Sequence, residues 1–219
     1  MKGQLIVIEG LDGSGKATQA KRLYQSLLEQ GRTVRQISFP DYASDSSALV
    51  KMYLAGDFGS DPGDVNAYAA STFFAVDRYA SFKRGWRAFY EGGGIVIADR
   101  YTTSNAVHQC SKLPESEWDA FLQWLFHFEY ELLGIPAPDR VFYLQTETVL
   151  NEKLLTGRYH GHEEQKDIHE RNADYLDRSR AAAEYCAQRL GWTTVHCVRD
   201  GAMRPIEDIH TELLSLLDA

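Results

Sequence analysis

The chain has 219 residues, of which 44% are hydrophobic and 25% are charged, and its formal net charge is −8. This length suits one domain with a sizeable core, and the composition is ordinary for a soluble globular protein. The acidic balance argues against broad nucleic-acid binding, because a phosphate backbone requires clustered Lys and Arg. No apolar run is long enough to span a membrane, so we expect neither a nucleic acid nor a membrane as a partner.

Strand-length apolar runs alternate with helical patterns along the chain. The predicted strands are Leu5–Glu9, Thr33–Ser38, Gly94–Asp99, Arg140–Gln145 and Thr193–Val198. The predicted helices are Lys16–Gln30, Val65–Tyr90, Glu115–Leu133 and a last one that opens at Pro205. Strands separated by helices form parallel crossovers, so we predict an α/β fold: a three-layer α/β/α sandwich with a five-stranded parallel sheet.

The ends of these strands predict where a ligand binds. Ligands of open parallel sheets lie beyond the carboxyl ends of the strands. Gly10, Phe39, Asp99 and Gln145 end or follow predicted strands, so we expect one cleft to collect them. No linker rich in Pro, Gly or Ser divides the chain, which predicts a single domain over residues 1–219.

The three cysteines have neither C-x-x-C spacing nor histidines at the intervals of a zinc site. They are Cys110, Cys186 and Cys197. No signal peptide is visible at the amino end. We therefore predict reduced and mostly buried thiols and a cytoplasmic location.

The first predicted strand runs into GLDGSGKATQ, residues 10–19, which nearly matches the phosphate-binding pattern G-x-x-x-x-G-K-[ST]. Its glycines let successive backbone N–H groups face phosphate oxygens, and Lys16 reaches the β- and γ-phosphates. The strand before it and the helix after it are the context that this motif requires, which predicts a fold of the P-loop NTPase type. The predicted ATP site comprises Gly10, Gly13, Ser14, Gly15, Lys16, Ala17 and Thr18.

Ala17 occupies the motif position that normally carries a hydroxyl group in contact with Mg²⁺. Thr18 cannot replace it, because one step along a helix rotates the side chain by about 100°, and we expect Thr18 to face the helix–sheet contact. Mg²⁺ commonly keeps several waters and takes only one or two carboxylates. We therefore predict that Mg²⁺ is held by phosphates, waters and carboxylates, with Asp12, Asp99 and Glu170 as the candidate ligands.

Four further stretches follow at places where a second substrate would bind. They are FPDY (39–42), FFAVDRY (73–79), DRYTTSNAVHQ (99–109) and TGRYHGHEEQKDIHERNADYL (156–176). Together with EGLDGSGKATQ, in this order and spacing, they resemble the thymidylate kinase family, which transfers the γ-phosphoryl group of ATP to dTMP. The resemblance implies ATP and dTMP as substrates, Mg²⁺ as the cofactor and a homodimer.

The resemblance also implies a catalytic set of four residues: Lys16, Asp99, Arg100 and Arg158. Arg100 would hold the phosphate of dTMP, because a planar guanidinium suits oxyanions, and Asp99 would orient the metal or the attacking oxygen. Residues of about 156–167 would form a lid that closes over ATP and excludes water, with Arg158 in contact with the nucleotide.

For the acceptor, the resemblance implies a base site and a sugar site. Phe74 would stack on thymine, Arg78 would hydrogen-bond the edge of the base, and Asn105 would read the base or sugar from the opposite wall. In the sugar site, Asp12 would bind the 3′-hydroxyl region and Phe39 would shape the pocket. His108 stands where the family usually has a tyrosine that packs beneath the deoxyribose.

Two other interpretations remain open from the residues alone. Asp41 and His108 could reshape the acceptor pocket for another nucleotide or for a deoxynucleoside. Ala17 is the argument for a nucleotide-binding module that no longer catalyses. Arg78 also has a simpler interpretation, a salt bridge with its neighbour Asp77, and Phe74 could belong to the core.

Overall fold

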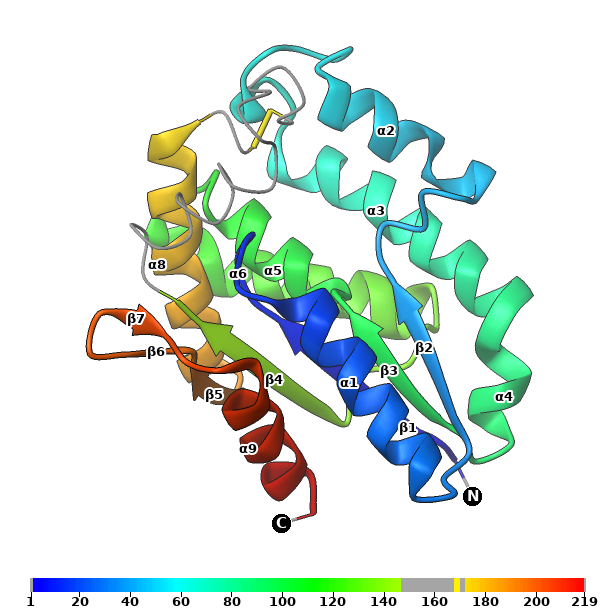
Figure 1. Cartoon of the computed structure of the whole chain (residues 1–219). Helices are drawn as coiled ribbons and strands as arrows, with labels where there is room; N and C mark the ends of the chain where they lie inside the picture. Colours follow the sequence, from blue (N-terminus) through cyan, green and yellow to red (C-terminus); the bar gives the residue numbers. More distant parts are fainter. Residues whose placement is uncertain (1, 147–167, 170–171, 219) are drawn as a thin grey trace.

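The computed structural model describes residues 2–146, 168–169 and 172–218 (Figure 1). Its main sheet has five parallel strands in the order β2-β3-β1-β4-β5. These are β1 (Gln4–Glu9), β2 (Val34–Ser38), β3 (Ile95–Asp99), β4 (Arg140–Gln145) and β5 (Thr193–His196). The first four strands lie where the sequence predicts them to within one residue, β5 ends earlier than predicted, and the five-stranded parallel sheet is confirmed.

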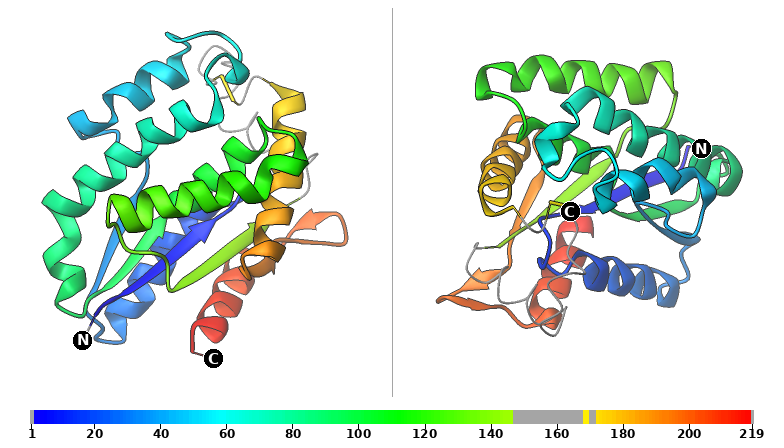
Figure 2. Two further views of the ribbon diagram at one scale, coloured as in Figure 1. Left: turned by 180° about the vertical axis from the view of Figure 1, so that it is seen from behind. Right: turned by 90° about the horizontal axis from the view of Figure 1, so that it is seen from above.

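Helices cover both faces of this sheet. Figure 1 shows α1 (Lys16–Glu29) and α9 (Ile206–Asp218) in front of the strands. The left view of Figure 2 shows α5 (Thr102–Cys110) and α6 (Trp118–Phe126) over the other face. Alternate residues of β1 divide between these layers: Ile6 packs with α1 and α9, whereas Leu5 packs on the opposite face. The three-layer sandwich is therefore confirmed.

The long helix predicted over Val65–Tyr90 is divided into three parts. They are α3 (Ala67–Ser81), a π-helical segment (Phe82–Trp86) and α4 (Arg87–Glu91). Asn66 caps α3 by accepting a hydrogen bond from the Ala69 amide at 2.9 Å. The π segment places both Phe82 and Trp86 in the core against the sheet, which explains the break in the regular α-helix.

The helix predicted over Glu115–Leu133 is likewise divided. A short 3-10 turn (Glu115–Glu117) leads into α6, and a π-helical segment (His127–Leu132) ends it. Glu129 lies in that π segment and is fully buried. π-helical turns occur frequently at functional sites, which makes Glu129 a candidate site residue.

Among the α-helices of the described residues, α2 (Ala48–Ala55), α5 and α8 (Ala173–Arg189) were not predicted. Most residues of α5 are buried although Thr, Ser and Asn are weak helix formers, so tertiary packing rather than propensity stabilises this helix. The predicted fifth strand is too long, because Val198–Arg199 forms β6 of a separate hairpin with β7 (Ala202–Met203).

All three cysteines are free thiols and buried, as predicted for these side chains. No helix in the described part of the chain is both long and apolar enough to cross a bilayer.

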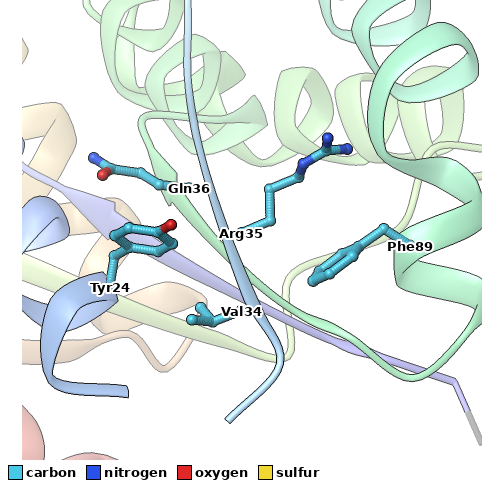
Figure 3. A pocket seen from close by; sticks show the side chains of 5 residues that line it. All are labelled: Tyr24, Val34, Arg35, Gln36 and Phe89. Carbon is cyan, nitrogen blue, oxygen red and sulfur yellow. The ribbon is translucent and has the colours of Figure 1, made fainter. Parts of the chain in front are cut away.

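An open pocket lies beside edge strand β2, between Tyr24 of α1 and Phe89 of α4 (Figure 3). It adjoins Val34, the first residue of β2, and therefore lies away from the carboxyl edge of the sheet.

Candidate active site

The loop between β1 and α1 has the geometry of a phosphate cradle. Gly10 has a φ of 157°, and a Cβ atom built there would lie 2.5 Å from Ser14 Oγ and 2.9 Å from the Leu144 carbonyl oxygen. Only glycine fits between these atoms. Gly13 and Gly15 also have positive φ angles, and α1 begins at Lys16. The loop therefore leads into the amino end of a helix, where free backbone N–H groups can bind an anion.

Lys16 is buried inside the loop. Its ammonium group donates a hydrogen bond to the Leu11 carbonyl at 2.8 Å and lies 3.7 Å from Asp12 Oδ1. Burial and the neighbouring charge of Arg100 lower the pKa of Lys16 to about 8, against the opposing effect of nearby carboxylates. The ammonium form therefore predominates at neutral pH, as a phosphate-binding lysine requires.

Ala17 and Thr18 lie on the first turn of α1 and are both exposed. The prediction that Thr18 faces the helix–sheet contact is wrong. The buried face of α1 is formed instead by residues such as Ala20, Leu23 and Leu27.

Arg100 follows β3 in a left-handed backbone conformation, with a φ of 64°. This conformation costs a non-glycine residue about 1–2 kcal/mol, so the surrounding contacts must hold it. The Arg100 amide donates to the Ile8 carbonyl at 3.2 Å, and the guanidinium forms an ion pair with Asp12. Arg100 thus joins the end of β3 to the phosphate loop.

The same guanidinium contacts α5. Arg100 Nη1 donates to Ser104 Oγ at 3.2 Å and lies 3.3 Å from His108 Nε2. Burial and the positive charge of Arg100 lower the pKa of His108 to about 3, so the imidazole is neutral and its Nε2 accepts from Arg100. The structure therefore brings Lys16, which is expected to bind ATP, together with Asp12, Arg100 and His108, which are expected to bind dTMP.

Glu9 is a site residue that the sequence analysis missed. This carboxylate is 1% exposed, and its Oε1 accepts a hydrogen bond from the Gly10 amide at 2.9 Å. Its Oε2 accepts from the hydroxyls of Thr103 at 2.5 Å and Ser104 at 2.8 Å. Glu9 thereby connects the phosphate loop to the start of α5. The available signal was an acidic residue at the end of an otherwise apolar buried strand.

Asp99 ends β3 and is the carboxylate best suited to a metal. Its Oδ1 is buried and has no hydrogen-bond partner within the described part of the chain. Burial raises the pKa of Asp99, while the charges of Lys16 and Arg100 act in the opposite direction. A buried, unpaired carboxylate oxygen beside the phosphate loop fits a Mg²⁺ ion that otherwise binds phosphates and water.

Asp12 fits that role less well because it already pairs with two cations. Burial alone would raise the pKa of Asp12, but Arg100 and Lys16 together lower it well below its usual range. Across the described ranges, no group of three or more His, Cys, Asp or Glu side chains could hold a metal. Glu170, the third predicted ligand, lies outside the described residues, as do Arg158 and the predicted lid over 156–167.

Phe74 and Arg78 lie one turn apart on α3. Phe74 is half-buried, and its ring stands edge-on to Tyr53 with the ring centroids 6.2 Å apart. Arg78 is 1% exposed and forms a two-pronged ion pair with Glu129, not with Asp77. Asp77 instead accepts a hydrogen bond from the Asp41 amide at 2.8 Å.

Asn105 lies beside Arg78. Its Nδ2 donates to Glu129 Oε1 at 3.2 Å, the same oxygen that binds Arg78, and to the Ser71 carbonyl at 3.1 Å. Arg78 on α3 and Asn105 on α5 are thus joined through one carboxylate oxygen, and the contact of Asn105 with the acceptor stays a prediction. Phe39 is a core residue packed against Tyr101, with ring centroids 5.9 Å apart.

A stack of rings closes the His108 side of the site. His108 and His169 stack with centroids 5.7 Å apart, and Tyr175 donates from its hydroxyl to the His108 carbonyl at 3.0 Å. Tyr53 Oη lies 2.8 Å from His169 Nε2 and accepts from Lys112 Nζ at 2.7 Å. His169 and Lys112 were not predicted, since their positions depend on contacts between segments far apart in the sequence.

A glycine-rich phosphate loop at the carboxyl edge of a parallel sheet, joined through Asp12 to an arginine after the third strand, defines a P-loop nucleotide kinase. The sequence model of the thymidylate kinase family matches residues 8–213 of the chain. The protein therefore belongs to the thymidylate kinase family.

Individual relatives agree with this assignment. The chain is 34% identical over 191 residues to thymidylate kinase of Mycobacterium tuberculosis, covering 86% of this chain and 87% of the relative. It is 26% identical over 212 residues to human thymidylate kinase, covering 97% and 88%. The solved structure of thymidylate kinase from Candida albicans superposes with a TM-score of 0.69 at 21% identity, covering 99% of this chain and 92% of that chain, and shows the same fold.

Proposed function

We propose that this protein is a dTMP kinase that transfers the γ-phosphoryl group of ATP to dTMP and forms dTDP and ADP. The observation that carries the proposal is the joint contact of Lys16 and Arg100 with Asp12. One cation belongs to the donor loop and the other to the proposed acceptor site, so Asp12 holds the two phosphate-binding groups side by side. Family membership and the names of the relatives support the same reaction.

The arrangement suits a reaction whose rate comes from positioning and charge neutralisation. Lys16 binds the donor phosphates from within the loop, while Arg100 grips the phosphate of dTMP. No side chain has to act as a strong base, because the attacking phosphate oxygen is already an anion at neutral pH. Glu9 fixes the distance between the two cations by binding the loop and the start of α5.

Mg²⁺ would be held by the phosphates of ATP, by water and by Asp99, and would neutralise charge on the transferred group. The unpaired Oδ1 of Asp99 supports this assignment. Ala17 is exposed at the start of α1 and offers no oxygen ligand. In the lid, Arg158 would contact ATP.

The acceptor base would stack on Phe74, with Arg78 and Asn105 at its edge. His108 would lie beneath the sugar, because its ring adjoins the arginine that grips the acceptor phosphate.

The buried free thiols support a cytoplasmic location, which recovery in the cytosolic fraction of cells would test.

The apolar surface of α3 supports a homodimer. Tyr68, Val76 and Tyr79 are exposed on α3, and the Tyr68 ring packs on Trp124 of α6 with centroids 4.7 Å apart. Burial of this surface against a second copy removes it from water. We expect sedimentation at micromolar protein to give a dimer, and a clean monomer would contradict this assignment.

The decisive experiment is a coupled ADP-release assay with dTMP, dUMP, UMP, dCMP and thymidine as acceptors. We expect turnover with dTMP, weaker turnover with the other monophosphates, and loss of activity in EDTA. Greatest activity with thymidine or another monophosphate would instead indicate a kinase for that acceptor. ADP release with none of them would indicate a nucleotide-binding module without catalysis.

A further inference from the structure

Glu129 is a buried carboxylate with four hydrogen-bond donors around it. It is 0% exposed, and it comes from the π-helical segment after α6. Its Oε2 accepts from Arg78 Nε at 2.7 Å and from Thr102 Oγ1 at 2.8 Å. Its Oε1 accepts from Arg78 Nη2 at 2.5 Å and from Asn105 Nδ2 at 3.2 Å. A carboxylate has about four lone-pair positions, so Glu129 is fully satisfied and binds no substrate itself.

This network determines which groups Arg78 and Asn105 can offer to a ligand. Arginine has five N–H donors, and the described contacts use one on Nε, one on Nη2 and one, to the Tyr101 carbonyl, on Nη1. One donor remains on each terminal nitrogen of Arg78. This side chain can therefore pair only with an acceptor on the base.

Asn105 is constrained in the opposite sense. Both of its amide hydrogens are used, one on Glu129 Oε1 and one on the Ser71 carbonyl. The reversed amide would place Oδ1 against a carboxylate and a carbonyl, which both repel it. Only Oδ1 of Asn105 remains for a ligand, and an amide oxygen pairs only with a donor.

An adjoining donor and acceptor on the protein match one pyrimidine and mismatch the other. Thymine presents an O4 acceptor beside an N3–H donor, whereas cytosine presents an N4–H₂ donor beside an N3 acceptor. Against cytosine, Arg78 would face a donor and Asn105 would face an acceptor. A buried site whose polar groups are left unpaired in this way rejects the wrong ligand strongly.

We propose that Glu129 is the positioning residue that sets this donor–acceptor pattern, so that the site accepts thymine and rejects cytosine. The inference rests on the proposed function, since it assumes that Arg78 and Asn105 lie at the edge of the acceptor base. Glu129 acts only through these two side chains. Its loss should therefore change selectivity among bases more than it changes phosphoryl transfer.

Glu129→Gln tests this role at nearly constant volume. A glutamine offers one acceptor oxygen in place of two and turns an NH₂ group toward at least one of the donors. Asn105 then loses the charged acceptor that holds its amide, and only the Ser71 carbonyl still opposes reversal. A reversed amide presents N–H to the base, which suits N3 of cytosine. We expect the dissociation constant for dTMP to rise by about 10-fold or more and the dTMP-over-dCMP affinity ratio to fall by at least as much.

Equilibrium binding of dTMP, dUMP and dCMP, measured by calorimetry, reads this selectivity without requiring turnover. Affinity for dUMP should fall together with that for dTMP, because uracil has the same edge. Glu131→Gln is the matched control: its side chain is 72% exposed in the same π segment and pairs only with His127 among the described contacts. We expect Glu131→Gln to leave all three affinities unchanged.

Thr102→Val is a second variant in case Glu129→Gln does not fold. It removes one of the four donors but keeps the buried ion pair, and a smaller fall in the dTMP-over-dCMP ratio is expected. An unchanged ratio in a folded Glu129→Gln protein with normal ATP affinity would overturn the proposal. So would wild-type protein that binds dCMP as tightly as dTMP, whatever its turnover. Selective dTMP binding without ADP release would contradict only the proposed function.

Discussion

Lys16→Ala is expected to lower kcat by about 10²–10³-fold while the KM for dTMP changes little. The Lys16 ammonium lies inside the phosphate loop and belongs to the donor side of the site. Its charge is needed as negative charge accumulates on the transferred phosphoryl group, so its loss should affect the transition state more than the binding of the acceptor. Steady-state kinetics with dTMP varied at saturating ATP measure this effect.

Lys21→Ala provides the matched control, because Lys21 lies on the same helix and is exposed. We expect its kinetics to equal those of the wild type. A Lys16→Ala protein with wild-type kcat would show that the loop does not bind the transferred phosphate. Loss of activity in both variants would point to disruption of α1 rather than to the chemistry of Lys16.

Arg100→Ala is expected to act on the acceptor, raising the KM for dTMP and lowering kcat/KM by about 10²–10³-fold. This corresponds to the loss of roughly 2.7–4 kcal/mol from a partly buried charge-assisted contact. The structure adds a second cause, because Arg100 also carries the ion pair with Asp12 and lies 3.7 Å from Glu9. Removing the guanidinium leaves both carboxylates with less compensation and loosens the contact between β3 and the phosphate loop.

Arg100→Lys separates these two effects. A lysine keeps the positive charge near Asp12 but cannot bind a phosphate in the two-pronged manner of a guanidinium. We expect the KM for dTMP to stay high in Arg100→Lys while thermal stability returns toward that of the wild type. Arg87→Ala, which removes an exposed pair with Glu91, should change neither quantity. Wild-type kinetics of Arg100→Ala with dTMP would show that the acceptor site lies elsewhere.

The kinetic division between Lys16 and Arg100 also tests the arrangement around Asp12. The two cations approach the same carboxylate, although one belongs to the donor loop and the other follows β3. Binding a donor phosphate and an acceptor phosphate to these cations would place the two phosphates next to each other. This proximity is what an in-line transfer requires.

Several elements of the fold could be predicted because their signals are local. The apolar run of β1 followed by Gly10 and Lys16 specifies a strand, a turn and a helix within residues 4–29. The same holds for the strand that ends at Asp99 and for the helix after Pro205. Strands separated by helices then require parallel crossovers, which is why the layers and the sheet were predicted correctly.

The breaks within the two long helices were not predictable in this way. Apolar periodicity over Val65–Tyr90 fits one helix, yet the π segment at Phe82–Trp86 forms because the aromatic side chains pack against the sheet. Helix α5 shows the converse, since its Thr, Ser and Asn residues give little helical signal and become helical by burial.

The sequence by itself determined the phosphate loop, the parallel sheet, the family motifs and the candidate residues at the strand ends. Only the tertiary structure decided their partners: Arg78 pairs with Glu129 rather than with its neighbour Asp77, and Asn105 shares that carboxylate. The physical reason is the sequence separation over which each interaction acts. Hydrophobic periodicity and glycine turns depend on residues that are close in sequence. A buried charge instead pairs with the opposite charge that the packing of distant segments places within reach. Arg78 and Glu129 are 51 positions apart, and no local pattern connects them.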